Sequence, residues 1–151
     1  MKSDSSSDLF GALDGRGSGQ EREAIRELKR RYGTALPKQL IAHYKSASAW
    51  RVRAACVFYC LEFARVSDDA VNLAKIAITD RSKVVRYRAC MVFACSLRMD
   101  VLPFLENAVQ TARGETRGDL VAAIDAIEHQ NQNFFLDREH AGMTTLNVIV
   151  V

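Results

Sequence analysis

The chain has 151 residues, of which 48% are hydrophobic and 26% are charged, as is ordinary for a globular protein. This length indicates one domain or a short run of small repeats, and the composition excludes a disordered chain, a collagen-like fibre and a disulfide-rich miniprotein. The net charge of +3 is too small to require a polyanionic partner, and two prolines with eight glycines provide few of the turns that an all-β fold needs.

The N-terminal segment, residues 1–19, is rich in Ser, Asp and Gly, and we expect it to be a flexible leader. A short apolar patch at residues 9–13 offers the alternative that the segment docks as one helical turn. A first helix is predicted from residue 20 onward because apolar side chains recur at helical spacing on one face, at Ala24, Ile25, Leu28 and Tyr32. Gly33 stands where such a helix would end.

The apolar periodicity of residues 36–129 predicts a succession of helices that group into pairs. A short first helix precedes a strongly apolar one at 49–65. The next helix begins at Ser67, which is a good N-cap, and a second strongly apolar helix begins at Ser82. Two further helices fill the rest of this segment.

The two strongly apolar helices share a sequence. Residues 51–60 align with residues 86–95 without a gap at an offset of 35, which pairs Phe58 with Phe93. A degenerate third copy begins near Arg117. A helix pair repeated at such a period is typical of a solenoid.

The second copy carries a recognisable pattern after Asp80, namely Val85-Arg86-x-x-Ala89-x-x-x-Phe93. This pattern resembles the HEAT-like, armadillo-type family of α-helical repeats, in which an Asp in the turn is followed by Val-Arg-x-x-Ala on the second helix of a pair. The first copy departs from it, since Trp50 replaces the Val and no Asp precedes Arg51.

The resemblance implies a mainly α fold. We expect a short right-handed α-solenoid of about three helix pairs with a leading helix, over residues 20–129. In this family the arginines that match Arg51 and Arg86 bond turn carbonyls or a turn Asp, here Asp80. The family includes scaffolds, inhibitors, nucleic-acid binders and a few enzymes, so the resemblance bears on fold more than on function.

The C-terminal segment, residues 130–151, has a different composition. Residues 134–137 and 144–151 are rich in aromatic and β-branched side chains, and Gly142 lies between them. We predict a β-hairpin-like cap with Gly142 at positive φ. Its turn has a faint likeness to a calcium loop but has Val148 in place of the bidentate Glu, so we expect no metal there.

Four cysteines fall inside the helical patterns, and we expect them to be reduced and buried as small hydrophobic side chains, without metal: Cys56, Cys60, Cys90 and Cys95. The longest nearly unbroken apolar run, residues 54–61, is far shorter than the roughly 20 residues of a membrane span. The first 20 residues lack the apolar run of a signal peptide. The sequence therefore predicts a cytoplasmic protein with no membrane partner.

We expect the second helices of the pairs to line a groove that binds another protein with an acidic surface. Arg53 and Arg88 are equivalent in the alignment, and on stacked helices they would stand about 8–10 Å apart. Trp50, Tyr59 and Tyr87 are the expected aromatic anchors, because Arg and aromatic residues dominate interface energetics. The prediction is a non-catalytic binding module without cofactor: an inhibitor, an immunity-type antagonist or an adaptor.

Two other functions remain open at this stage. Residues 22–53 and 81–98 are rich in Lys and Arg, which would suit nucleic acid, although residues 99–129 are acidic and would repel phosphate. A less favoured alternative is a HEAT-like DNA-modifying enzyme, with Trp50 and Tyr59 stacking on a base and Asp80 as the acid. The three histidines lie in separate segments and match no catalytic motif.

Overall fold

The computed structural model describes residues 5–151. Over this range the chain forms only helices, turns and irregular segments. The α-helices are α1 (Ser6–Gly11), α2 (Gly19–Tyr32), α3 (Leu36–Ser46), α4 (Trp50–Phe58), α5 (Asp68–Ala77), α6 (Lys83–Ser96), α7 (Leu102–Thr111) and α8 (Gly114–Glu128). Short 3-10 helices are η1 (Gly33–Ala35), η2 (Leu61–Phe63), η3 (Met99–Val101) and η4 (Gln132–Phe135). The predicted mainly α class is confirmed.

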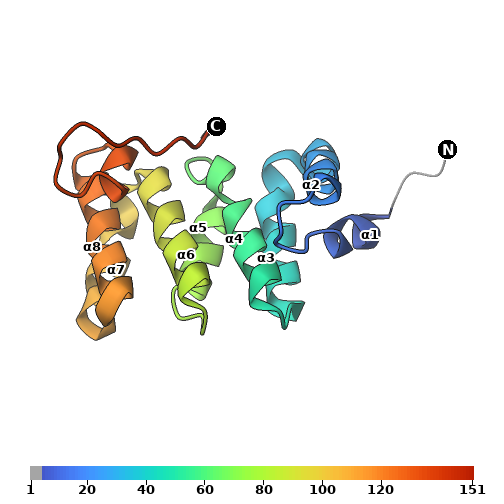
Figure 1. Ribbon diagram of the computed structural model, residues 1–151, viewed down its shortest axis with the longest axis horizontal. Coiled ribbons are helices and arrows are strands. Elements are labelled where there is room, and N and C mark those ends of the chain that lie inside the picture. Colours follow the sequence, from blue (N-terminus) through green and yellow to red (C-terminus); the bar gives the residue numbers. More distant parts are fainter. Residues whose placement is uncertain (1–4) are drawn as a thin grey trace.

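The helices follow one another along the long axis of the molecule, from α1 and α2 at one end to α7 and α8 at the other (Figure 1). Helix α6 packs between α4 and α8, and each of these three helices also packs against the helix that precedes it in the chain. The result is a row formed by α4, α6 and α8 in front of α3, α5 and α7 (Figure 1). No helix among the described residues is both long and apolar enough to cross a bilayer.

Serine N-caps mark several of the helix starts. The hydroxyls of Ser18, Ser67 and Ser82 each accept a hydrogen bond from the backbone N–H three residues later, as the sequence predicts for Ser67 and Ser82. The predicted helix at 49–65 is divided in the structure. It ends at Phe58 and continues as η2, and this change of direction brings the Arg65 guanidinium to the Cys95 carbonyl at 3.0 Å.

Part of the segment that we expected to be a flexible leader is helical. Ser5 caps α1 with a reciprocal capping box, and Leu9 and Leu13 are buried in the common core. The Tyr32 hydroxyl donates to Ser6 Oγ at 2.8 Å and fixes α1 on α2. Docking of the apolar patch, the alternative left open by the sequence, is therefore what the structure has, while the prediction for residues 1–4 lies outside the described residues.

The alignment at an offset of 35 pairs the wrong side chains. Phe58 is 44% exposed, whereas Phe93 is completely buried, so the two rings occupy unrelated environments although α4 and α6 are neighbours. The contacts match Arg53 with Arg86 instead, because Arg53 Nη1 donates to Ser48 O at 2.6 Å and Arg86 Nη1 donates to Asp80 O at 2.7 Å. Arg53 and Arg86 are structurally equivalent because each donates to a carbonyl of the turn before its own helix. The identical residues at an offset of 35 do not occupy equivalent positions.

The predicted β-hairpin cap is wrong, since no strand forms among the described residues of the C-terminal segment. After η4 the chain runs irregularly back over one end of the α8–α6–α4 row (Figure 1). Its backbone groups bond to side chains: Asn133 Oδ1 accepts from Leu146 N–H, and Gln132 Nε2 donates to Leu146 O. The Val151 N–H donates to Glu62 O. These bonds replace the partners that a second strand would supply.

Candidate binding surface

Arg53, predicted to contact a partner, is instead part of the interior. It is 8% exposed, and its guanidinium binds both carboxylate oxygens of Asp80, at 2.8 Å from Nε and 3.1 Å from Nη2. The Tyr44 hydroxyl donates to the same carboxylate at 2.6 Å, and Ser82 N–H donates at 2.9 Å. These bonds tie the α3–α4 pair to the turn before α6, so Arg53 is a structural residue.

The Asp80 carboxylate is held in its ionised form by this cluster. Burial by itself would raise its pKa, but hydrogen bonds from Arg53, Tyr44 and the Ser82 N–H outweigh that effect and lower the pKa to about 2. Burial and the hydrogen bond to Asp80 raise the pKa of Tyr44. Arg53 thus uses most of its donors inside the fold: two on Asp80 and two on the carbonyl oxygens of residues 47 and 48.

Arg51 takes the exposed position that was expected for Arg53. Its guanidinium lies 5.3 Å from the centroid of the Trp50 ring, and Trp50 is 43% exposed. Trp50 and Arg53 border a shallow recess with Ser48, Arg81 and Ser82 at the start of α4. Tyr59 follows the other end of α4, so Trp50 and Tyr59 do not share one groove.

Tyr59 and Arg88 do come together, beside Phe58 and Glu21. Glu21 is buried and accepts hydrogen bonds from Gly15 N–H at 2.6 Å and from the Tyr59 hydroxyl at 2.7 Å. The Arg88 guanidinium lies 5.2 Å from the centroid of the Phe58 ring. Glu21 thus fixes the position of Tyr59, and the guanidinium of Arg88 packs on the Phe58 ring.

Arg88 is a half-buried cation without a hydrogen-bond or ion-pair partner within residues 5–151. Burial lowers the pKa of its guanidinium, although Glu21 and Tyr59 partly counteract this effect. It still carries its charge at neutral pH, because an arginine remains protonated even with a reduced pKa. Its donors are therefore partly removed from water and remain available to an acceptor.

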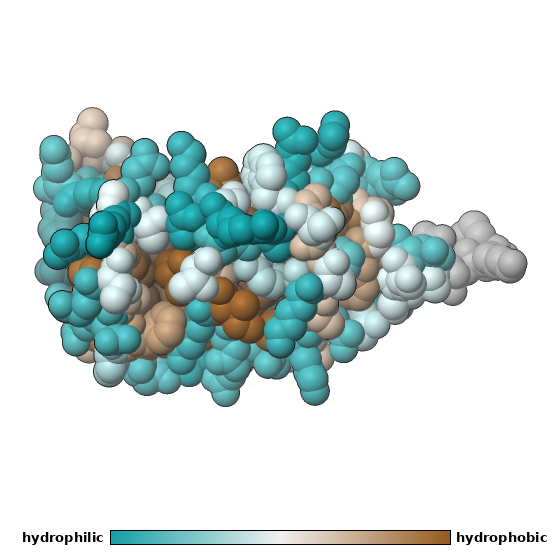
Figure 2. Space-filling view, turned by 90° about the horizontal axis from the view of Figure 1, so that it is seen from below, coloured by the Kyte–Doolittle hydropathy of each residue, from teal (hydrophilic) through white to brown (hydrophobic). Residues whose placement is uncertain are grey.

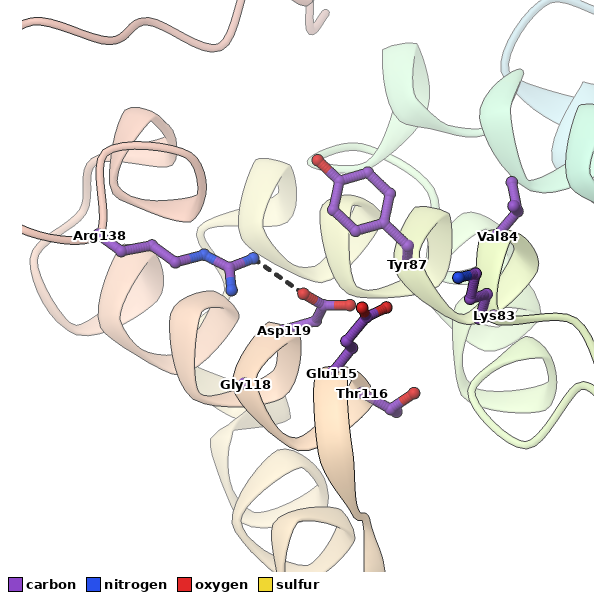
Figure 3. A pocket seen from close by; sticks show the side chains of 8 residues that line it. All are labelled: Lys83, Val84, Tyr87, Glu115, Thr116, Gly118, Asp119 and Arg138. Carbon is purple, nitrogen blue, oxygen red and sulfur yellow. Dashed lines mark hydrogen bonds and ion pairs between the residues drawn. The ribbon is translucent and has the colours of Figure 1, made fainter.

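Tyr87 lines a cavity between the N-terminal parts of α6 and α8, with a volume of about 440 Å³ (Figure 3). Its ring packs 5.3 Å from that of Phe135, and burial raises the pKa of its hydroxyl. Arg138 Nη2 donates to the Asp119 carboxylate at 2.9 Å across the far wall. Lys83 from α6 and Glu115 from α8 also line this cavity (Figure 3).

A second recess lies between the end of α4 and the C-terminal segment. It has a volume of about 330 Å³, and Phe58, Tyr59, Val148 and Ile149 contribute most of its apolar lining. We use the name α6 face for the surface formed by Phe58, Tyr59, Val84, Tyr87 and Arg88. The first recess shares Val84 and Tyr87 with this face, and the second shares Phe58 and Tyr59 with it.

A third recess, of about 370 Å³, lies between the α5–α6 and α7–α8 turns. Apolar residues reach the surface near the middle of the molecule and toward its α7–α8 end in the view from below (Figure 2). Two arginines line this recess. Arg86 already donates to Thr116 Oγ1 at 2.8 Å and to Asp80 O, and Arg113 is exposed to water. Neither is a half-buried cation in need of an acceptor, so this recess is less suited to a partner's carboxylate than the α6 face.

Two residues of this surface, Phe58 and Glu21, were missed by sequence reasoning. Phe58 was paired with the buried Phe93, and Glu21 looked like an ordinary charge in the first turn of α2. The glycines of the preceding loop were the available signal, because Gly15 and Gly17 adopt positive φ and their two N–H groups need an acceptor, which Glu21 supplies.

Comparison of the chain with protein-family models, curated proteins and solved structures found no significant match. Family membership is therefore not shown, and the HEAT-like resemblance stays a prediction from the residues. Function has to be argued from the surface itself.

Proposed function

We propose that this chain is a non-catalytic protein-binding module whose α6 face receives an acidic segment of another protein. The observation that carries the proposal is Arg88, a half-buried guanidinium that no described residue hydrogen-bonds. A carboxylate of a partner would supply the missing acceptors, and paired guanidinium–carboxylate bonds are among the strongest hydrogen bonds in proteins.

The surroundings of Arg88 favour a protein partner over a small ion. Phe58 and Tyr59 place two aromatic side chains beside this cation, and interface energy is concentrated in such residues. The two recesses that share residues with the α6 face would accept side chains that flank the acidic residue. Glu21 fixes Tyr59 before any partner arrives, so little conformational entropy is lost on binding.

The roles that fit such a module are an inhibitor, an immunity-type antagonist or an adaptor, and the HEAT-like resemblance is compatible with each. We place the protein in the cytoplasm. The support for this location is the state of its thiols, because all four cysteines are free and buried. Burial raises the pKa of Cys56 and of Cys95 to about 12, as suits thiols with a packing role.

Nucleic acid is the weaker candidate, because several of the basic residues already have acidic partners. Lys29 pairs with Glu62 at 2.7 Å, and Arg31 pairs with Glu27 at 3.0 Å. The DNA-modifying alternative is also weakened, because Asp80 is fully hydrogen-bonded and its pKa of about 2 makes it a poor proton donor.

Site-specific photo-crosslinking tests the proposal in the native host. A photoreactive residue at Tyr87 is compared with one at Val121, which is 50% exposed on α8 away from the α6 face. We expect one protein to be captured from position 87 and not from position 121. Equal capture from both positions, or capture of nucleic acid alone, would contradict the proposal.

The captured protein is then purified, and its affinity is measured for the wild type, Arg88→Gln and Arg51→Gln. Arg51 is the matched control, because it is an arginine on the same row of helices whose guanidinium rests on an exposed ring. We expect Arg88→Gln to weaken binding at least about 10-fold, as loss of a hot-spot residue does, and Arg51→Gln to change it little. Similar effects of the two substitutions on affinity would contradict the proposal that Arg88 binds the acidic segment.

A further inference from the structure

Two of the three histidines, from segments far apart in sequence, meet one carboxylate at the end of α8. His129 Nδ1 lies 3.0 Å from Asp125 Oδ1, and His140 Nε2 lies 2.6 Å from Asp125 Oδ2. The ligand atoms of these three residues all lie within 4.8 Å of one another. Asp125 and His129 are four residues apart on one helix face, whereas His140 comes from the turn that follows η4.

The turn holds His140 firmly in this position. His140 has a φ of +56°, which is uncommon for a residue other than Gly, and its N–H donates to Asp137 O. The Asp137 carboxylate accepts from the N–H groups of Ala141 and Gly142, at 2.9 and 2.8 Å. The Phe134 ring stacks on the imidazole, with centroids 3.8 Å apart and an angle of 13° between the planes. The imidazole is thus ordered by the fold before any ligand binds.

We propose that Asp125, His129 and His140 bind one divalent transition-metal ion, and that Zn²⁺ is the ion that fits this donor set best. Two imidazole nitrogens and one carboxylate oxygen are a common protein ligand set for zinc, with a fourth tetrahedral position left for water. Calcium and magnesium are disfavoured, because they select oxygen ligands.

The donor separations are close to those that a tetrahedral ion needs. With zinc–nitrogen and zinc–oxygen bonds of about 2.0–2.1 Å, neighbouring donors stand about 3.3 Å apart. The 3.0 Å and 2.6 Å separations join the two imidazoles to different oxygens of the Asp125 carboxylate. They would open by about 0.3 Å and about 0.7 Å when the ion replaces the present hydrogen bonds, and the carboxylate would turn so that one oxygen meets the ion. His129 Nδ1 would also give up its contact with the Asp125 carbonyl oxygen at 3.0 Å. The ion would fasten the C-terminal turn to α8, and this site does not depend on the proposed function of the α6 face.

Direct titration with zinc tests the site. The full chain is prepared without a polyhistidine tag and titrated with Zn²⁺ by calorimetry or by competition with a chromophoric chelator, beside His129→Gln, His140→Gln and His43→Gln. His43 is the control, because it lies on α3 near Phe10, remote from the other histidines in sequence and in its contacts. We expect one ion per chain and a melting temperature that rises with zinc.

Loss of either site histidine should weaken zinc binding by about 100-fold or more, because even changes outside the ligand set of a metal site cost about 10–100-fold. His43→Gln should bind as the wild type does. No saturable binding to the wild type at about 100 μM Zn²⁺, or full affinity in His129→Gln and His140→Gln, would overturn the proposal and leave a purely hydrogen-bonded cluster.

A second measurement on the wild type needs no substitution. Imidazole ¹⁵N resonances are followed by NMR during the titration, and those of His129 and His140 should shift together while those of His43 stay in place. Binding through the cysteines is separable, because it would leave all three imidazoles unchanged. That result would also overturn the proposal.

Discussion

The polar cluster around Asp80 and the α6 face each contain an arginine, and the two arginines have opposite surroundings. Arg53 is buried, and its guanidinium makes four hydrogen bonds, to both oxygens of the Asp80 carboxylate and to the main-chain oxygens of residues 47 and 48. Arg88 is half-buried, rests on Phe58 and lacks an acceptor within the described residues. The acceptors around a guanidinium therefore decide whether it stabilises the fold or is available for binding, and its position in a repeat does not.

The largest effect that separates the two regions is expected at Asp80. Asp80→Ala would leave Arg53 charged, buried and unpaired, and we expect the free energy of unfolding to fall by about 3–5 kcal/mol. Urea unfolding measures this loss. Asp100→Ala is the control, because Asp100 pairs with Arg98 in the open and should matter far less. A loss at Asp80 as small as that at Asp100 would contradict the structural role of the cluster.

The same carboxylate predicts how stability depends on pH. The pKa of Asp80 is lowered to about 2 in the folded chain, below its usual value near 4, so its contribution is present above about pH 4. That contribution, about 2 kcal/mol, should disappear as the pH falls from about 4 to 2. Urea unfolding of the wild type and of Asp80→Asn across this pH range measures the change. A difference in free energy of unfolding that stays constant with pH would contradict the prediction.

A smaller loss is expected at Tyr59, which links the interior to the α6 face. Tyr59→Phe removes the hydroxyl that donates to Glu21 at 2.7 Å, and we expect a loss of about 1–2 kcal/mol. Binding of the partner should also weaken, because the ring is then less firmly held. Tyr32→Phe, which removes a hydroxyl bonded to Ser6 near the surface, is the comparison and should leave partner binding unchanged.

The smallest change in stability is expected at Arg88. Arg88→Met keeps the apolar stem against Phe58 and removes a charge that is partly withdrawn from water. We expect a free energy of unfolding equal to that of the wild type within about 0.5 kcal/mol, or slightly higher. A marked loss of stability would show that Arg88 supports the fold, as Arg53 does, and would contradict our interpretation that it is available for binding.

Local signals in the sequence predicted most of the helices. The serine N-caps and the apolar spacing depend on neighbours within one or two turns, so Ser67 and Ser82 could be placed without knowledge of tertiary structure. The early end of α4 could not be placed, because residues 59–65 are mostly apolar and contain no Gly or Pro. The hydrogen bond from Arg65 to the Cys95 carbonyl joins residues 30 apart in the sequence, so no local signal predicts it.

The errors concern contacts between distant segments. The β-branched residues of 144–151 predicted a strand, but in the structure the side-chain amides of Gln132 and Asn133 hydrogen-bond the backbone there. His129 and His140 looked unrelated because only the turn held by Asp137 brings them together. The availability of Arg88 depends in the same way on its neighbours Phe58, Tyr59 and Glu21, which come from α4 and α2 and are not placed beside it by any spacing along the chain.

A double-mutant cycle between Arg88 and the acidic residue of the captured partner tests the central claim most directly. Affinities are measured for the wild-type pair, for Arg88→Gln, for the partner with its acidic residue neutralised, and for both changes together. The account predicts a coupling free energy of at least about 1.5 kcal/mol, as close charge pairs at interfaces show. Additive effects of the two changes would mean that Arg88 does not meet that carboxylate, and would contradict the account.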